Sequence, residues 1–129
     1  MVLVDSSVWV RAEHLRIDLR ELLPPNEDVA VCPMIVQEVL RGTRNPMRFA
    51  RMQNVFENCV MLDDPTPLAR FEAAAQLFID CRAAGVTPAS VDTLIAACAI
   101  AYGVPLLHED EDFTHIARVY PKLNVLTRS

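Results

Sequence analysis

The chain has 129 residues, of which 52% are hydrophobic, and its formal net charge is −5. This length supports a real hydrophobic core, so we expect residues 1–129 to form a single domain, and the composition excludes a disordered chain. The acidic balance argues against a general nucleic-acid binder. No apolar stretch approaches the roughly 20 residues that a membrane span needs. An acid at position 5 argues against a signal peptide, so we expect a cytoplasmic protein with no membrane partner.

Short apolar runs rich in β-branched residues predict strands at residues 2–4, 29–31, 60–62, 104–107 and 124–127. Apolar residues at helical spacing predict helices around residues 9–10, continuing as a stripe over 15–23, and then at 33–42, 46–58, 68–84, 90–103 and 113–117. In the helix at 68–84, the expected core-facing stripe is Phe71, Ala75, Phe78 and Ile79. Strands that alternate with helices predict an α/β fold with a mainly parallel sheet flanked by helices.

Charged residues are unevenly distributed along the chain. Eleven of the twelve cations are arginines, and residues 41–51 contain four of them and no acid. Residues 109–112 form an unbroken acidic run. The four cysteines are scattered without a C-x-x-C pair, and there are only three histidines. This pattern favours a reducing compartment and argues against a zinc or histidine-rich metal site.

Several carboxylates stand at positions where α/β proteins bind ligands. Asp5 directly follows the first strand, and Asp110 follows the predicted strand at 104–107. Asp92 lies in the first turn of a helix, and Glu38 lies inside an otherwise apolar one. Strand ends and the starts of the following helices gather at one edge of a parallel sheet, so these acids can converge. Three of them also have a structural interpretation: Asp5 as a helix cap, Asp92 as a partner of the helix dipole, and Glu38 as a solvated position.

A cluster of carboxylates is costly without a counter-ion. Two carboxylates about 4 Å apart repel by roughly 4 kcal/mol at an effective dielectric constant near 20. A divalent cation removes this cost, and a site built only from oxygen ligands selects a hard ion, which predicts Mg²⁺ or Mn²⁺.

Four sequence segments together resemble the PIN-domain ribonucleases, and among them the VapC-type toxins of bacterial toxin–antitoxin pairs. The segments are Val-Leu-Val-Asp-Ser-Ser-Val-Trp at the start, Ile-Val-Gln-Glu-Val-Leu-Arg-Gly around Glu38, Val-Asp-Thr-Leu-Ile-Ala-Ala at Asp92, and Leu-Leu-His-Glu-Asp-Glu-Asp-Phe near the end. They occur in the family's order and cover nearly the whole chain.

The resemblance implies an acidic quartet of Asp5, Glu38, Asp92 and Asp110. Asp112 is similar to a fifth acid of many members, and Ser6 stands where the family has a Thr or Ser beside the metal. We expect Asp5, Asp92, Asp110 and Asp112 to hold the metal, and Glu38 to ligate through water or orient the attacking water. His108 departs from the family, because many members have Thr or Ser there, so a strand-end hydroxyl contact is in question.

The function implied by the resemblance is a Mg²⁺-dependent endoribonuclease that leaves a 5′-phosphate and a 3′-hydroxyl. It further implies a toxin that forms a homodimer and is inhibited by a small VapB-like antitoxin. The basic residues Arg41, Arg44, Arg48 and Arg51 are candidates for RNA phosphate contact or for docking an acidic partner, with a solvated helix face as the alternative. Two other classes remain: a non-catalytic PIN-like binding module and a receiver-like phospho-acceptor domain. A receiver-like domain is expected to carry paired acids just after the first strand and a late lysine, and this chain has neither in the right place.

Overall fold

A computed structural model of the protein describes residues 1–127, and within them five parallel strands form one sheet in the order β3-β2-β1-β4-β5. The strands are β1 (Val2–Val4), β2 (Val29–Val31), β3 (Val60–Met61), β4 (Leu106–His108) and β5 (Val125–Thr127). The predicted α/β fold with a parallel sheet is therefore confirmed. The strand order reverses between β1 and β4, and in an open α/β sheet ligands bind at such a point, beyond the carboxyl ends of the strands.

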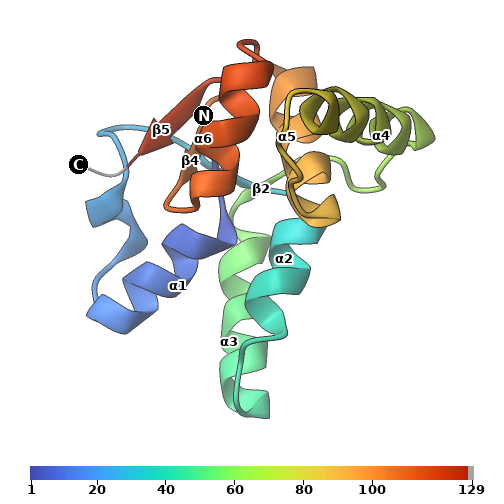
Figure 1. Ribbon diagram of the computed structural model, residues 1–129. Helices are drawn as coiled ribbons and strands as arrows, with labels where there is room; N and C mark the ends of the chain where they lie inside the picture. Colours follow the sequence, from blue (N-terminus) through green and yellow to red (C-terminus); the bar gives the residue numbers. More distant parts are fainter. Residues whose placement is uncertain (128–129) are drawn as a thin grey trace.

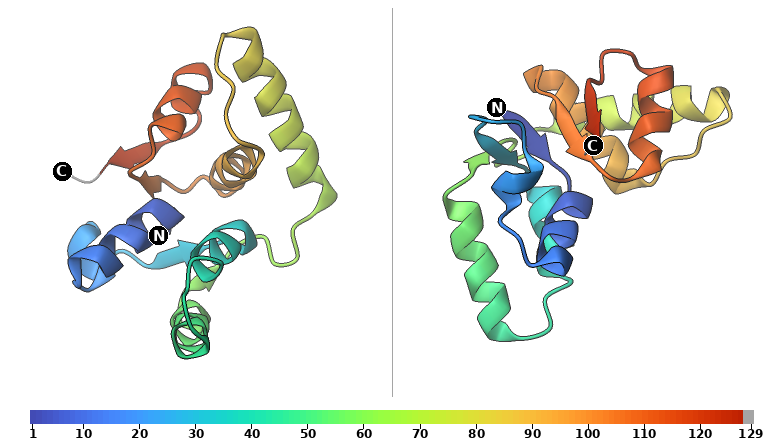
Figure 2. Two further views of the ribbon diagram at one scale, coloured as in Figure 1. Left: turned by 60° about the horizontal axis from the view of Figure 1, so that its bottom comes forward. Right: turned by 90° about the vertical axis from the view of Figure 1, so that its left-hand side faces the viewer.

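The α-helices cover the sheet in two groups (Figures 1 and 2). They are α1 (Ser6–Leu15), α2 (Pro33–Leu40), α3 (Pro46–Glu57), α4 (Leu68–Ala83), α5 (Ser90–Tyr102) and α6 (Glu111–Val119). Figure 1 shows α1, α2 and α3 below the sheet, and α4, α5 and α6 above it. Right-handed crossovers produce this division, because the chain winds outward from β1 to β3 and then returns to β4 and β5. None of the described helices is both long and apolar enough to cross a membrane.

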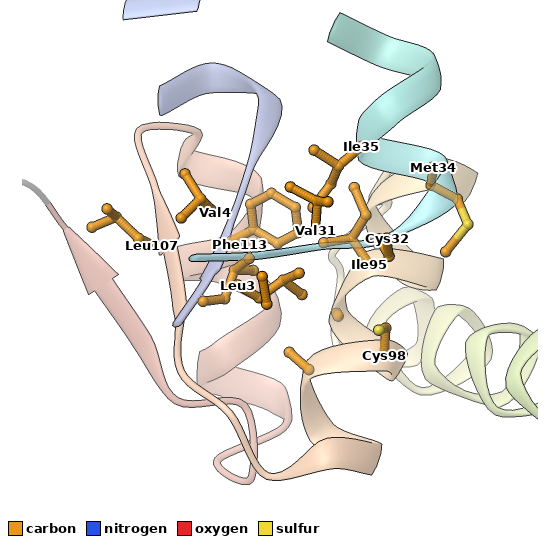
Figure 3. Close-up of a cluster of buried hydrophobic side chains, with 14 of the residues drawn as sticks. Leu3, Val4, Val31, Cys32, Met34, Ile35, Ile95, Cys98, Leu107 and Phe113 are labelled. Carbon is orange, nitrogen blue, oxygen red and sulfur yellow. The ribbon is translucent and has the colours of Figure 1, made fainter. Parts of the chain in front are cut away.

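The core lies between the central strands and the helices on both faces of the sheet. All three residues of β1 are fully buried, which explains why this strand shows no polar alternation. Figure 3 shows Leu3 and Val4 surrounded by side chains from the helices, including Ile35 of α2 and Ile95 of α5. Because β1 is the middle strand, the position of Asp5 just after it is fixed by packing on both faces.

The predicted stripe over residues 15–23 is not one continuous helix. Arg16, at φ 54°, ends α1 in the left-handed conformation. The chain then forms a separate 3₁₀ helix, Leu19–Leu22, which begins at the capping side chain of Asp18. The Asp18 carboxylate accepts a hydrogen bond from the Arg20 N–H, and this local bond competes with continuation of α1.

The predicted inner face of α4 is wrong. The buried residues of α4 are Ala74, Leu77 and Cys81, whereas Phe71 and Ile79 are 47% and 48% exposed. Both sets recur at helical spacing, so the period alone could not decide which one faces the core. In the structure, α4 packs against α5 through the side that carries Ala74, Leu77 and Cys81. The side that carries Phe71 and Ile79 forms an apolar stripe on the outside.

A buried ion pair fixes the start of α4. Asp63 follows β3, and its carboxylate accepts hydrogen bonds from Arg70 Nε at 2.7 Å and Nη2 at 3.2 Å. The Asp63 N–H lies 3.3 Å from the Tyr102 hydroxyl oxygen, which connects this pair to the end of α5. Burial alone would raise the pKa of Asp63, but the hydrogen bonds from Arg70 and Tyr102 outweigh it and the pKa is lowered.

Candidate active site

Asp5 stands between the end of β1 and the start of α1. Its N–H donates to the Leu107 carbonyl oxygen at 3.0 Å, which joins the carboxyl ends of β1 and β4. Its Oδ2 accepts hydrogen bonds from Ser7 N at 3.1 Å and from Ser7 Oγ at 2.6 Å. Its Oδ1 is buried and has no hydrogen-bond partner. Asp5 therefore caps α1 with one carboxylate oxygen and leaves the other unsatisfied, so its capping and chemical roles are compatible.

Ser7 also connects two segments that are far apart in the sequence. Besides donating to Asp5, its Oγ accepts a hydrogen bond from the Glu109 N–H at 3.0 Å, across 102 positions. The hydroxyl thus holds the Asp5 carboxylate and the turn between β4 and α6 together. The Asp-Ser-Ser spacing could indicate a hydrogen bond to Asp5, but no sequence signal indicated the contact to Glu109.

Glu38 lies in the last turn of α2, and its side chain reaches toward α1. Its Oε1 accepts a hydrogen bond from Ser6 Oγ at 3.1 Å. The residue is partly buried, and its pKa is raised by burial first and then by the charge of Asp5. The solvated-face interpretation of Glu38 is therefore not what the structure shows, since the carboxylate has a fixed partner and is electrostatically coupled to Asp5.

Three carboxylates from α5 and α6 come together beside Asp5. One carboxylate oxygen each from Asp92, Asp110 and Asp112 lies within 4.8 Å of the others. Asp92 comes from the first turn of α5, and Asp110 caps α6 by accepting a hydrogen bond from the Asp112 N–H at 3.0 Å. The structure thus places all five acids named from the sequence at the reversal point between β1 and β4, while Asp5 and Glu38 lie outside this closest group of three.

The electrostatics of the cluster are those of an anionic site. Burial raises the pKa of Asp92 to about 8, with further contributions from the charges of Asp110 and Asp5. Burial likewise raises the pKa of Asp5, although hydrogen bonds from Ser7 oppose the rise. A buried group that is reluctant to ionise beside other carboxylates is typical of a site that binds a cation or a proton.

His108 fills the space beneath α6 instead of contributing a hydroxyl. It is 1% exposed, and its ring packs edge-on against Phe113, with 5.4 Å between the ring centroids. Neither ring nitrogen makes a hydrogen bond of normal geometry. Burial lowers its pKa, so the imidazole is neutral near pH 7. His108 therefore acts as a packing residue below the acidic cluster.

The four arginines of the basic zone do not share one helix face. Arg41 is the C-cap of α2, Arg44 lies in the turn before α3, and Arg48 and Arg51 lie on α3. The two helices α2 and α3 are separate, as predicted from the sequence, because Asn45 caps the start of α3 and Pro46 is its first residue. Arg48 pairs with Glu13 of α1. The charge of Arg41 partly opposes the rise in the pKa of Glu38, so Arg41 lies near the acidic site.

The residues of this cluster fit a divalent metal ion. Carboxylate oxygens are the ligands that hard cations prefer, and three of them are already close together at Asp92, Asp110 and Asp112. The buried, unpaired Oδ1 of Asp5 is a fourth oxygen with no protein donor to satisfy it. A buried polar atom of this kind requires a partner that the protein itself does not supply.

Comparison with known proteins identifies the family of this chain. The family model described as PIN domain matches residues 2–119. The chain is 33% identical over 128 residues to Ribonuclease VapC11 of Mycobacterium tuberculosis and to VapC ribonuclease Mb1587 of Mycobacterium bovis, covering 92% of this chain and 93% of each relative.

Solved structures of low sequence identity share the fold. A chain of DNA-bound VapBC from Salmonella typhimurium matches with a TM-score of 0.80 at 16% identity, over 98% of this chain and 96% of that one. A chain of VapBC2 from Rickettsia felis, bound to a promoter DNA fragment, matches with a TM-score of 0.78 at 20% identity, over 100% of both chains. The chain therefore belongs to the PIN-domain family and, within it, to the group of VapC ribonucleases.

Proposed function

We propose that this protein is a metal-dependent endoribonuclease that acts as the toxin of a toxin–antitoxin pair. The observation that carries the proposal is the set of carboxylates at the β1–β4 reversal point, where three oxygens lie within 4.8 Å and a fourth, buried one has no partner. Relatives of matching length are named ribonucleases, and the structural neighbours include VapBC structures, one of which is described as a member of the VapBC family of toxin–antitoxin systems.

The proposed cofactor is Mg²⁺, with Mn²⁺ as a second ion of the same hard character, because the candidate ligands are all carboxylate oxygens. Asp92, Asp110 and Asp112 would hold the ion, and Asp5 would offer its unpaired Oδ1. When bound, such an ion would lower the pKa of water and stabilise the negative charge that develops on the scissile phosphate.

The remaining groups orient the reactants. The Glu38 carboxylate accepts a hydrogen bond from Ser6, and the charge of Asp5 contributes to its raised pKa. The role proposed for Glu38 is to accept a hydrogen bond from the attacking water. Ser7 fixes the Asp5 carboxylate in one orientation. His108 is buried and neutral, and no role as a general base is assigned to it. The expected products carry a 5′-phosphate and a 3′-hydroxyl.

The proposed partners are RNA, a VapB-like antitoxin and a second copy of this chain. Arg41, Arg44 and Arg51 are exposed, with no ion pair among the described residues, and they extend from the acidic site along α2 and α3. Such residues suit RNA phosphates, and an acidic antitoxin segment would compete for them. The homodimer is supported by the exposed apolar stripe of α4. The proposed location is the cytoplasm, where RNA and an antitoxin of this kind would be found.

A cleavage assay tests the proposed activity directly. The purified protein should cleave RNA in Mg²⁺ or Mn²⁺ and stop when EDTA is added, because the site has no alternative base or covalent nucleophile. Asp92→Asn should abolish cleavage, whereas Asp28→Asn, which removes the same charge from an exposed residue outside the site, should not. Cleavage that continues undiminished in EDTA would contradict the mechanism. A protein that binds RNA but never cleaves it would be a binding module.

A further inference from the structure

A cavity adjoins the acidic cluster at the carboxyl ends of β4 and β5. Its volume is about 400 Å³, and its lining includes Arg11 of α1, Thr114 of α6, Thr127 of β5 and Asp110. It therefore shares Asp110 with the cluster of Asp92, Asp110 and Asp112. A molecule in this cavity would be continuous with whatever is bound at the carboxylates.

Arg11 is the one cation among the residues that line this cavity in the described part of the chain. It is exposed, and within residues 1–127 it forms no ion pair. It lies one helical turn after Ser7, so both side chains lie on the same side of α1. Ser7 contacts Glu109 on the turn that precedes α6. That side of α1 therefore borders the cavity, and Arg11 lies further from Asp5 along the helix.

We propose that this cavity binds the nucleotide next to the scissile phosphate of an RNA strand, with Arg11 contacting its backbone phosphate. The proposal rests on the ribonuclease activity proposed above. The volume lies within the range of small-ligand sites, roughly 300–1,000 Å³, and is large enough for one nucleotide. The guanidinium matches a phosphate, while the hydroxyls of Thr114 and Thr127 and the neighbouring carboxylates can bind ribose and base groups.

The negative charge of the cavity lining makes the positive charge of Arg11 important for binding RNA. Three of the other lining residues are the carboxylates Glu109, Asp110 and Glu111, which repel a polyanion. Without Arg11 the cavity would present only negative charge to the RNA. Removing this arginine should therefore weaken RNA binding more than removing an arginine that lies on an ordinary exposed surface.

The test compares Arg11→Ala with Arg118→Ala, a matched control that removes an exposed arginine from the last turn of α6. RNA cleavage by each variant should be measured with a short single-stranded RNA of mixed sequence in Mg²⁺. For Arg11→Ala we expect KM to rise roughly tenfold with little change in kcat, since one charge-assisted contact is lost. Arg11→Lys should restore part of the affinity, because it keeps the charge but not the planar fork.

Binding of the same RNA should be measured in an Asp92→Asn background, in which cleavage is stopped. Arg11→Ala should lower the slope of log affinity against log salt by about one, as expected for one lost phosphate contact. Equal KM and equal salt slope for Arg11→Ala and Arg118→Ala would overturn the proposal while leaving the ribonuclease function intact. A wild-type protein that cleaves no RNA would instead overturn the proposed function, and the binding measurement would still decide the role of Arg11.

Discussion

At the scale of single residues, the most consequential contact is the one made by Ser7. Its hydroxyl donates to Oδ2 of Asp5 and accepts from the Glu109 N–H. The first bond satisfies one carboxylate oxygen and so leaves Oδ1 as the atom available to a cation. The Ser7 side chain thus determines which oxygen of the Asp5 carboxylate remains without a hydrogen bond.

Ser7→Ala should weaken metal binding without unfolding the protein. Losing the hydroxyl removes two hydrogen bonds and frees the Asp5 carboxylate to rotate, whereas the Ser7 N–H still caps it. We expect the Mg²⁺ concentration for half-maximal activity to rise several-fold, and the Mg²⁺-induced rise in melting temperature to shrink. Ser7→Thr keeps the hydroxyl and should restore both. If alanine and threonine behave alike, the hydroxyl does not position Asp5.

The residues that could be identified from the sequence are those whose position along the chain already implies a place in space. Asp5 and Asp110 follow buried strands, so a parallel sheet brings them to one edge. Ser7 could not be found in this way, because it contacts Glu109, which lies 102 positions away. Arg11 could not be found either, because the cavity that it lines with residues of β4, α6 and β5 exists only in the folded chain. The packing of His108 against Phe113 could not be predicted either, because it depends on where α6 lies over the sheet.

At the scale of elements, α4 shows how a correct helix can be assigned the wrong face. Its bounds were predicted to within one residue, yet its buried residues were not. Leu68, Phe71 and Ile79 are exposed instead, at 73%, 47% and 48%. They repeat at helical spacing on the side that faces away from α5. An exposed apolar stripe of this length is typical of a protein–protein contact.

Replacing Phe71 and Ile79 by glutamate should convert a dimer into a monomer. Both side chains are about half exposed in the single chain, so charge there should disrupt association without disturbing the core. Size-exclusion chromatography with light scattering would measure the mass. Ala73→Glu adds charge to an exposed position of α4 off this stripe and should leave the mass unchanged. Equal masses for the double variant and wild type would show that this stripe is not the dimer contact.

At the scale of the whole molecule, the acidic cluster should make the stability of the fold depend on pH. The pKa of Asp92 is raised to about 8 in the folded protein, above its ordinary value of 3.8. Between these values the folded state binds the extra proton, so stability falls as pH rises toward 8. The pKa values of His108 and Asp63 are shifted in the opposite direction, downward from their ordinary values of 6.5 and 3.8. These two shifts therefore change the stability of the fold only below pH 6.5 and below pH 3.8. The change in stability between pH 6.5 and 8 therefore reflects the titration of Asp92 in the acidic cluster.

In EDTA, the wild-type melting temperature should fall by about 3–6 °C between pH 6.5 and 8. Asp92→Asn should flatten this dependence and melt higher than wild type at pH 8, because a neutral amide replaces a buried charge. Asp5→Asn is a less clear variant, since Asp5 also caps α1. Millimolar Mg²⁺ should raise the wild-type value at pH 8 and have little effect on Asp92→Asn. A rising melting temperature over this pH range in EDTA would contradict the assigned electrostatics.

The pairing of β1 with β4 also means that the acidic site is completed only late in the synthesis of the chain. Asp5 and Glu38 emerge early from the ribosome, but β4, Asp110 and Asp112 are made more than a hundred residues after β1. A nascent chain that lacks residues 106–112 has no partner for β1 at the reversal point and no complete set of carboxylates. If the carboxylates act together as proposed, the growing polypeptide should not cleave RNA until residues 106–112 have been made.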